Sequence, residues 1–370
     1  MTASLIPKQD FVGIEAVAHL AAGGEAPPLR AHMDAAVQFL CDKGAGMPGR
    51  ERMYALAGRV KRRLAELLGR SPAEIGFLFN ASEGLFVAAG GIDWRSGDNV
   101  VTAGSEFPSV RHAWHHGHPV EVRAVGGTLV PSLAEIRAAV DGRTRVIAVS
   151  HVSYLTGARC DLAALREIAD GVGARLVVDA SHALGVVPVD GALCDVVVSC
   201  CYKWMLGAHG VGVFFVNAER WPDLAAPWMG WHSIEPEPSP RADRLQPKAS
   251  MERFESGNYG FPGLYLLEAG LAALARVGAP AIERHVLALG GRLREELVRC
   301  GAEVLTPAAP ADRAGNIAIA HGGSERLEAA LRAAGVLTWA GNGRLRLSVH
   351  AYNDEADVAR AAAALAALLR

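Results

Sequence analysis

The chain of 370 residues lacks long apolar runs, a strong excess of one charge and any recognisable targeting segment. No stretch of eighteen apolar residues occurs, so we predict no membrane-spanning helix. Residues 1–11 do not combine a basic segment with an apolar one, and we therefore expect no secretory signal. The formal net charge is −2, which argues against nucleic acid or an anionic membrane as a partner.

Cysteines are few and follow no metal-binding or disulfide pattern. Their spacing matches neither a disulfide framework nor a CxxC zinc site, so we predict a reduced, cytoplasmic compartment and no metal. The six positions are Cys41, Cys160, Cys194, Cys200, Cys201 and Cys300. A second metal candidate is a histidine-rich stretch without carboxylates at ligand spacing, and we interpret it as a helix face and loop near the site. Its members are His112, His115, His116 and His118.

Between residues 53 and 216, short apolar runs alternate with amphipathic segments. This alternation is typical of an α/β fold whose buried parallel strands read as continuous apolar runs. We predict one seven-stranded, mostly parallel sheet. The strands expected are 76–79, 99–102, 120–125, 145–149, 175–179, 196–199 and 211–216, and the helices between them are 53–68, 83–89, 133–140 and 162–171.

The composition and periodicity of the sequence change after residue 216. Residues 217–257 are rich in Pro, Trp and charge and show no periodicity, which predicts a long functional or interface loop. Trp228, Trp231 and His232 in this loop are candidate walls of a substrate pocket. Helices are expected at 263–277 and 282–300, followed by a small α+β unit with strands 316–320, 336–339 and 345–349 and helices 325–334 and 354–369. We predict a large domain over residues 1–258 and a small C-terminal domain over residues 259–370.

Lys203 is a candidate catalytic residue because it follows a buried strand in the segment DVVVSCCYKWMLGAHGVG. Lysine is rarely buried without a partner or a function, and a desolvated lysine can form a Schiff base. The alternative from this segment alone is a surface lysine at a strand end. Cys200 and Cys201 precede it, and because neighbouring strand residues point to opposite faces, we assign neither a catalytic role.

Two further features would complete a site around Lys203. Asp179 ends the predicted strand 175–179, at the sheet edge where α/β proteins bind ligands, and a carboxylate there could keep a pyridinium nitrogen protonated. Its alternative role is to cap the following turn. Asn80, Ala81 and Ser82 form a predicted turn between the strand 76–79 and a helix that starts near Glu83, and the N–H groups at such a helix start, together with the Ser82 hydroxyl, can bind phosphate.

Several motifs together give the chain a resemblance to a known family. In order along the chain they are HLAAGGEAP, NASEG, SEFPS, SHVSYLTG, VVDASHALG, SCCYKWMLG, FESGN and RLRLSVHAYN. The chain resembles the class V aminotransferases, a branch of the fold-type I pyridoxal 5′-phosphate (PLP) enzymes that includes cysteine desulfurases, kynureninases and isopenicillin N epimerase-like proteins. The resemblance covers nearly the whole chain and implies PLP as the cofactor and the PLP-transferase fold type I.

The resemblance also implies roles for residues around the cofactor ring. Lys203 corresponds to the Schiff-base lysine and Asp179 to the partner of the pyridine nitrogen. His182 takes the place of a polar residue that contacts the ring oxygen or lies beside the ring. Phe107 falls where the family stacks an aromatic ring or a histidine on the cofactor, and Tyr154 falls where desulfurases have an asparagine.

Other positions are implied to bind the phosphate or the substrate. Ala81, Ser82 and Tyr202 correspond to phosphate ligands. Asn258 replaces a threonine that reaches the cofactor of the neighbouring subunit, which implies a homodimer with shared sites. Arg346 corresponds to the arginine that binds the α-carboxylate of an amino-acid substrate through its planar fork, with Arg344 as the weaker competitor.

Departures from the desulfurase pattern narrow the expected activity. The segment GVLTWAGNGRLRLS before Arg346 has no cysteine, and Phe107 and Tyr154 resemble kynureninases instead. The resemblance therefore favours an amino-acid transaminase or a carbon–sulfur or carbon–carbon lyase over a persulfide-forming desulfurase. An epimerase is an alternative, and so is a non-enzymatic nucleotide-binding protein, although Gly207, Gly210 and Gly212 precede a predicted strand and do not open a helix. His151 is interpreted as structural more readily than as catalytic.

Overall fold

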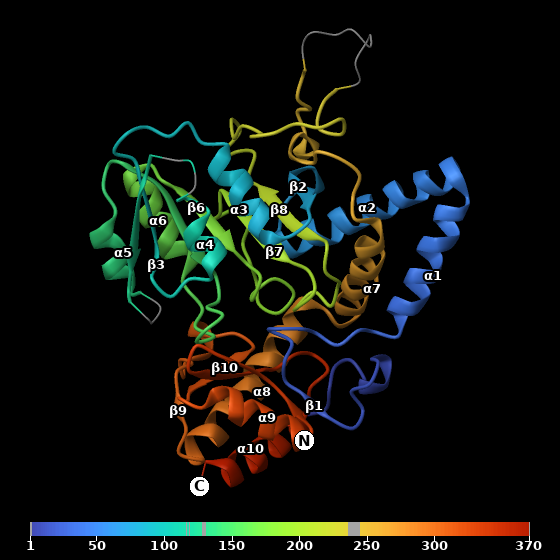
Figure 1. Ribbon diagram of the computed structural model, residues 1–370, viewed down its shortest axis with the longest axis vertical. Coiled ribbons are helices and arrows are strands. Elements are labelled where there is room, and N and C mark those ends of the chain that lie inside the picture. Colours follow the sequence, from blue (N-terminus) through green and yellow to red (C-terminus); the bar gives the residue numbers. More distant parts are fainter. Residues whose placement is uncertain (1, 116, 118, 128–130, 236–244, 370) are drawn as a thin grey trace.

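The structure is a computed structural model that describes residues 2–115, 117, 119–127, 131–235 and 245–369. A large α/β part occupies the upper half of Figure 1, and the C-terminal elements lie below it. The beginning of the chain also runs along this lower part, so both termini are at the same end of the molecule.

The large part is organised around one seven-stranded sheet, as the sequence predicts. Its strand order is β2-β8-β7-β6-β5-β3-β4, and within the described residues only β8 runs antiparallel to its neighbours. The strands are β2 (Ile75–Leu78), β3 (Asn99–Ala103), β4 (Glu121–Val125), β5 (Thr144–Ser150), β6 (Arg175–Asp179), β7 (Val196–Cys200) and β8 (Gly212–Val216). Every expected strand is present to within about a residue at either end. Most are short, buried runs rich in β-branched residues, whereas the edge strand β4 is largely exposed.

Helices cover both faces of this sheet. On one face lie α2 (Gly46–Leu68), α5 (Leu133–Ala139), α6 (Leu162–Val172) and α7 (Phe261–Val277); on the other lie α3 (Ala81–Gly90) and α4 (Pro108–His112). Side chains of the central strands alternate between the two cores: Val178 and Val197 belong to the first, Val177 and Val198 to the second. Two-sided burial explains why these strands read as continuous apolar runs.

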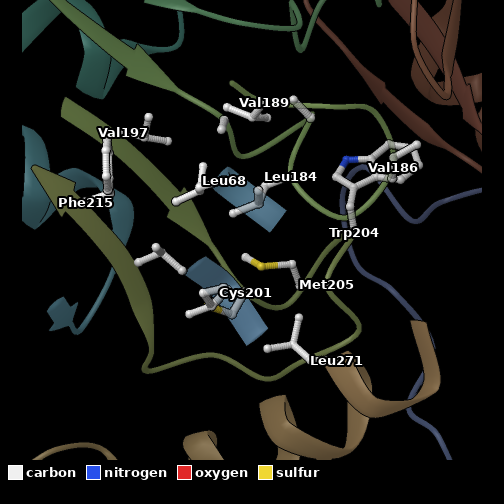
Figure 2. Close-up of a cluster of buried hydrophobic side chains, with 14 of the residues drawn as sticks. Leu68, Leu184, Val186, Val189, Val197, Cys201, Trp204, Met205, Phe215 and Leu271 are labelled. Carbon is white, nitrogen blue, oxygen red and sulfur yellow. The ribbon is translucent and has the colours of Figure 1, made fainter. Parts of the chain in front are cut away.

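The core on the α2 and α7 side includes the segment just after β7. Figure 2 shows Cys201 and Met205 pointing into the same cluster as Leu68 of α2 and Leu271 of α7. Cys200 instead packs on the α3 side. The two adjacent cysteines therefore anchor the end of β7 to both faces of the sheet.

The C-terminal part has its own core, built from a four-stranded antiparallel sheet and three helices. Its elements are α8 (Ala279–Arg299), β9 (Glu303–Val304), β10 (Asn316–Ala320), α9 (Ser324–Ala333), β11 (Val336–Leu337), β12 (Trp339–Gly341), β13 (Arg344–Ser348) and α10 (Glu355–Leu368). The strand expected over 336–339 divides, because β11 pairs with an N-terminal strand while β12 pairs with β13.

The N-terminal segment contributes elements that the sequence did not reveal. Strand β1 (Ala18–His19) pairs in parallel with β11, which places this segment on the C-terminal part; the domain boundary at 258/259 stays a prediction. Helix α1 (Ala31–Gly44) carries exposed Met33, Val37 and Leu40, so its burial pattern is not amphipathic within one chain. Short 3-10 helices complete the described elements: η1 (Lys8–Asp10), η2 (Pro72–Glu74), η3 (Met251–Phe254) and η4 (Pro310–Asp312).

In the part of the chain that the structure describes, no single helix is both long and apolar enough to span a membrane. The consecutive helices α7 and α8 pass the length and composition test only together, with a bend of 81° between them.

Candidate active site

The site forms where three parallel strands end side by side. Ser150 at the end of β5 pairs with Asp179 at the end of β6, and Asp179 pairs with Val198 of β7. Carboxyl ends of parallel strands form the edge at which α/β proteins bind ligands. Asp179 and the segment after β7 therefore lie at one sheet edge, as their sequence positions predict.

Lys203 is held on a tight loop directly after β7. The Gly207 backbone N–H donates to the Cys201 carbonyl at 2.9 Å, and Leu206 N–H donates to the Lys203 carbonyl at 3.2 Å. Leu206 has a φ of 53°, a left-handed conformation that costs a branched residue about 1–2 kcal/mol. Because the Leu206 side chain is fully buried, packing holds this strained turn in place.

The side chain of Lys203 is half-buried and points toward histidine. Its Nζ lies 3.2 Å from Nε2 of His182 and 5.5 Å from the centre of the Tyr202 ring. His182 is buried, and burial together with the charges of Lys203 and Arg346 holds its pKa well below the ordinary value. The ring is therefore neutral and can carry a single N–H beside the lysine.

Asp179 is a buried carboxylate suited to a cationic partner. It accepts a hydrogen bond of 2.8 Å from the Ser181 backbone N–H. Burial raises its pKa, an effect that this hydrogen bond and the positive charge of Lys203 oppose. A protonated ring nitrogen held against Asp179 would stabilise its charged form, so this residue fits a pyridinium cofactor.

The start of α3 offers backbone N–H groups beside the same edge. Asn80 caps this helix by accepting from Glu83 N–H at 2.8 Å. Ser82 Oγ and Ser109 Oγ lie 2.6 Å apart, so two hydroxyls join the N–H groups that follow Ala81. Gly84 allows α3 to approach the sheet closely, because a Cβ there would lie 2.7 Å from Val198 Cγ1. The arrangement fits a phosphate group.

Tyr202 and Phe107 border the site from two sides. The Tyr202 ring stacks on His209 with centroids 4.0 Å apart, and burial raises the pKa of its hydroxyl to about 12. The Phe107 side chain is 41% exposed, so its ring is free to stack on a bound group. It also contacts the Tyr154 ring edge-to-face, with centroids 5.3 Å apart. The structure therefore brings Phe107 and Tyr154 together.

Glu106 is a site component that the sequence alone did not single out. Its carboxylate accepts from the Ser150 backbone N–H at 2.6 Å and from the Ser150 hydroxyl at 2.5 Å. Burial raises the pKa of Glu106 to about 7. These bonds tie the turn that carries Phe107 to the end of β5.

Arg346 lies buried in the C-terminal part, facing the large part. Its Nη1 donates to the Tyr154 carbonyl at 2.6 Å, and its guanidinium lies 4.6 Å from the centre of the Trp339 ring. Nε is buried without a hydrogen-bond partner within the described residues, and burial lowers the pKa of the side chain to about 9. A buried guanidinium with a spare donor fits an anionic ligand. Arg344 instead donates to the carbonyl of Asn342 in the adjacent turn.

Asn258 contacts helix α2 through Arg50 and Tyr54. Its Oδ1 accepts from Arg50 Nη2 at 2.8 Å and lies 3.3 Å from the Tyr54 hydroxyl. Arg50 also lies over the Trp231 ring at 5.7 Å. Trp228 and Trp231 are exposed. The role of Asn258 toward a neighbouring subunit stays a prediction.

The surroundings of the remaining histidine and cysteine candidates indicate structural roles. His151 is buried, which lowers its pKa to about 3, and it accepts from Arg159 Nε at 3.3 Å. Burial also raises the pKa of the Cys200 and Cys201 thiols. His112 and His115 lie with ring centroids 5.7 Å apart, and His116 and His118 lie outside the described residues.

One group could be mistaken for a metal site. His232, Glu252 and Glu255 place ligand atoms within 4.8 Å of one another. Lys61 lies 2.9 Å from Glu255 and Lys248 lies 2.6 Å from Glu252, so lysines already compensate both carboxylates. We assign no metal to this group.

Tertiary structure adds four residues to the predicted set. Glu106 belongs to the motif SEFPS and could have been found there as an acid beside Phe107. Trp339, Asn316 and Ser348 could not, because only the register of β10, β12 and β13 brings them beside Arg346 and His182.

Comparison with known proteins agrees with this geometry. The family model "Aminotransferase class-V" matches residues 47–361. A kynureninase from Pseudomonas fluorescens is 30% identical over 272 residues, covering 70% of this chain but 64% of the kynureninase, slightly under two thirds of its length. A probable cysteine desulfurase from Methanothermobacter thermautotrophicus is 29% identical over 73% of this chain and 68% of its own.

Solved structures share the fold at lower identity. The apo cysteine desulfurase of Thermococcus onnurineus superposes with a TM-score of 0.89 at 22% identity, over 99% of both chains. A cystine C-S lyase, solved with its product cysteine persulfide, gives 0.88 at 20% identity, over 96% of this chain and 99% of its own. The PLP-transferase fold is thereby confirmed.

These findings also correct one alternative. A non-enzymatic nucleotide-binding protein is excluded because the matched family consists of PLP enzymes, and Gly207 and Gly210 lead into strand β8 (Gly212–Val216) and open no helix. The cofactor is PLP, and the residues at the sheet edge fit it. The chain belongs to the class V aminotransferase family of PLP-dependent enzymes.

Proposed function

We propose that this enzyme acts on an amino acid through PLP held covalently by Lys203, as a transaminase or a carbon–sulfur or carbon–carbon lyase. The observation that carries the proposal is the convergence of a half-buried lysine, a buried acid and a buried arginine from separate elements. Lys203 follows β7, Asp179 ends β6, and Arg346 comes from β13.

PLP, when bound, supplies a ring that accepts electrons from the substrate carbon. The negative charge of Asp179 would hold the ring nitrogen protonated, and the N–H groups at the start of α3 would hold the phosphate. Phe107, exposed at the rim, would cover one face of the ring. The Lys203 amine, when not bonded to the cofactor, would take the α-proton as a general base and return it as an acid.

Arg346 would bind the substrate carboxylate and so set the orientation of the α-proton. Its unpartnered Nε and the Trp339 ring beneath the guanidinium support a preformed anion site. The atom to which the proton returns then separates transamination from epimerisation, whereas loss of a β or γ substituent distinguishes a lyase. Epimerisation stays the alternative, and it would need the proton to return to the opposite face of the same carbon.

We propose that the enzyme does not form a persulfide on itself. The last cysteine of the chain is Cys300, on the exit of α8, where its thiol donates to the Ala362 carbonyl at 3.7 Å. The segment before Arg346 is a tight β12–β13 turn with Asn342 at a φ of 54° and carries no thiol. The cysteine desulfurases similar to this chain belong to the same family. The solved desulfurase structure from Thermococcus onnurineus is only 22% identical to this chain, so it supports the fold and not the activity.

We also propose a homodimer in the cytoplasm with shared sites. Exposed Met33, Val37 and Leu40 lie on α1, and Met47 lies at the start of α2, next to Arg50 and its partner Asn258. An apolar surface beside the residue expected to reach a neighbouring cofactor supports this assembly.

An absorbance scan tests the role of Lys203. After incubation with PLP and removal of the excess, the protein should show a band near the visible edge, and Lys203→Ala should lose it. Lys43→Ala, which removes an exposed lysine of α1, is the matched control and should keep the band. A band that survives Lys203→Ala unchanged contradicts the proposal.

The reaction type follows from a panel of amino acids with and without pyruvate or 2-oxoglutarate. Turnover that requires the keto acid indicates a transaminase, and release of pyruvate or alanine without one indicates a lyase. Loss of optical rotation alone indicates the epimerase.

A further inference from the structure

His182 receives hydrogen-bond donors on the ring nitrogen that faces away from Lys203. Asn316 Nδ2 lies 2.9 Å from His182 Nδ1, and Trp204 Nε1 lies 3.5 Å from the same atom. The indole N–H can only donate. Nδ1 therefore offers a lone pair, and the proton of the neutral ring resides on Nε2, the atom 3.2 Å from Lys203 Nζ.

The indole N–H of Trp204 also decides which way the Asn316 amide points, because Nδ1 must accept from it. With the Asn316 NH₂ group turned toward His182, Asn316 Oδ1 accepts from the Ser348 hydroxyl at 2.8 Å. The opposite orientation would place Oδ1 against Nδ1 and require a proton there, which would then face the indole N–H. Asn316 and Ser348 pair directly across β10 and β13.

The pair is sealed from solvent by the N-terminal loop. Asn316 and Ser348 are both completely buried. A Cβ at Gly23 would lie 2.5 Å from Asn316 Oδ1 and 2.7 Å from Ser348 Oγ, so only glycine allows the backbone this close. Water has no room to replace either bond, and a buried amide that lost its partner would be costly.

We propose that Asn316 is a positioning residue that holds His182 in the Nε2–H tautomer, so that His182 presents a hydrogen-bond donor to the nitrogen of Lys203. An ammonium group has no lone pair to accept such a bond, whereas an uncharged lysine nitrogen has one. The chain Ser348–Asn316–His182 thereby links the strand that carries Arg346 to the reactive lysine. This inference rests on the proposed function of Lys203.

The sharpest variant is Asn316→Asp, which has nearly the same shape but no N–H donor. The carboxylate would accept from Nδ1 and draw the proton of His182 to that atom. In protein labelled with ¹⁵N-histidine and free of PLP, the one-bond proton coupling of His182 should move from Nε2 to Nδ1, with His182→Gln identifying the signal. A coupling that stays on Nε2 overturns the inference.

A double-mutant cycle separates positioning from a general structural effect. In the PLP-loaded protein, Asn316→Asp should shift the pH midpoint of the visible band by about one unit or more, equivalent to about 1.4 kcal/mol. In the His182→Gln background the same change should shift it little, because the glutamine amide supplies its donor without help from Asn316. An equal shift in both backgrounds overturns the inference.

Two controls separate this inference from misfolding of the variant and from failure of the proposed function. If circular dichroism shows that Asn316→Asp does not fold, Asn316→Ala is used, and it should leave a mixture of His182 tautomers; an unchanged Nε2 signal again overturns the inference. Loss of the visible band in Lys203→Ala tests the proposed function separately, since the tautomer is measured without cofactor.

Discussion

At the scale of single residues, the site depends on polar groups that are buried or partly buried. Asp179, His182, Glu106 and Arg346 each have a pKa displaced from its ordinary value, and burial is the largest cause in every case. Such displacements gather at functional sites because a low-dielectric pocket lets one nearby charge change the protonation of another. PLP would bring the compensating charges for Asp179, and a substrate carboxylate those for Arg346.

Glu106 should make the stability of the protein depend on pH. Its pKa is about 7 in the folded protein, compared with 4.5 as the ordinary value, so the folded state holds an extra proton between these pH values. Stability is therefore greatest below about pH 4.5, as far as this group is concerned, and falls by up to about 1.4 kcal/mol per pH unit as pH rises toward 7.

The variant Glu106→Gln should flatten this decline. Thermal unfolding midpoints measured from pH 5 to pH 8 should change less in the variant than in the unaltered protein. Glu66→Gln, on the exposed face of α2, is the matched control. Equal pH profiles for all three proteins would show that Glu106 does not titrate in this range.

At the scale of elements, a buried ion-pair cluster joins helix α6 to the starts of strands β6 and β7, at the ends of these strands opposite the site. Asp195, just before β7, accepts from Arg166 of α6 at 2.5 Å, from Arg175 of β6 at 3.2 Å and from the Leu176 backbone N–H at 2.8 Å. The Asp195 and Arg166 side chains are 1% and 6% exposed. This cluster sets how β6 and β7, which end in Asp179 and Cys200, lie against each other.

Asp195→Ala should therefore lower the free energy of unfolding by up to about 3–5 kcal/mol, because it leaves the buried Arg166 guanidinium with only the exposed carboxylate of Asp170 as an ion-pair partner. Denaturant unfolding followed by circular dichroism measures the loss. Glu296→Ala breaks the exposed pair with Arg299 and should cost less than about 1 kcal/mol. Similar losses in the two variants would contradict the importance of burial here.

At the scale of the whole molecule, the two parts meet across the site. The N-terminal strand β1 pairs with β11 of the C-terminal part, and the Trp204 ring next to Lys203 stacks on His350 at 5.5 Å. Arg346 reaches Tyr154 across the same boundary. The site is therefore complete only when the C-terminal part is docked on the sheet edge.

The proposed dimer gives a prediction at this scale. Val37 on α1 is 60% exposed, and Val37→Glu should place a charge in the apolar surface and favour the monomer. Sedimentation should give a mass near 38.9 kDa for the variant and twice that for the unaltered protein. Val298→Glu, at a residue 50% exposed on α8, should remain dimeric. An unaltered protein that sediments as a monomer contradicts the proposal.

The sequence by itself determined the seven-stranded sheet, the helices α2, α3, α5 and α6, and the position of Lys203 and Asp179 at one sheet edge, whereas the short helix α4 was not predicted. It did so because a strand buried on both faces must be apolar throughout, and the polar residue that ends it stands out. Its motifs also predict cofactor- or substrate-binding roles for Ser82, Phe107, Tyr154 and Arg346.

Tertiary structure alone decided the partners of these residues. Asn316 lies at the start of a strand 134 positions after His182, and nothing in its local sequence distinguishes it from an ordinary polar strand end. Strand β1 was also missed because its partner β11 is distant in sequence, and helix α1 because the exposed Met33, Val37 and Leu40 obscure an amphipathic pattern. Lys203 is recognisable from its own strand, but the tautomer of the histidine beside it depends on a hydrogen bond that only the folded molecule can form.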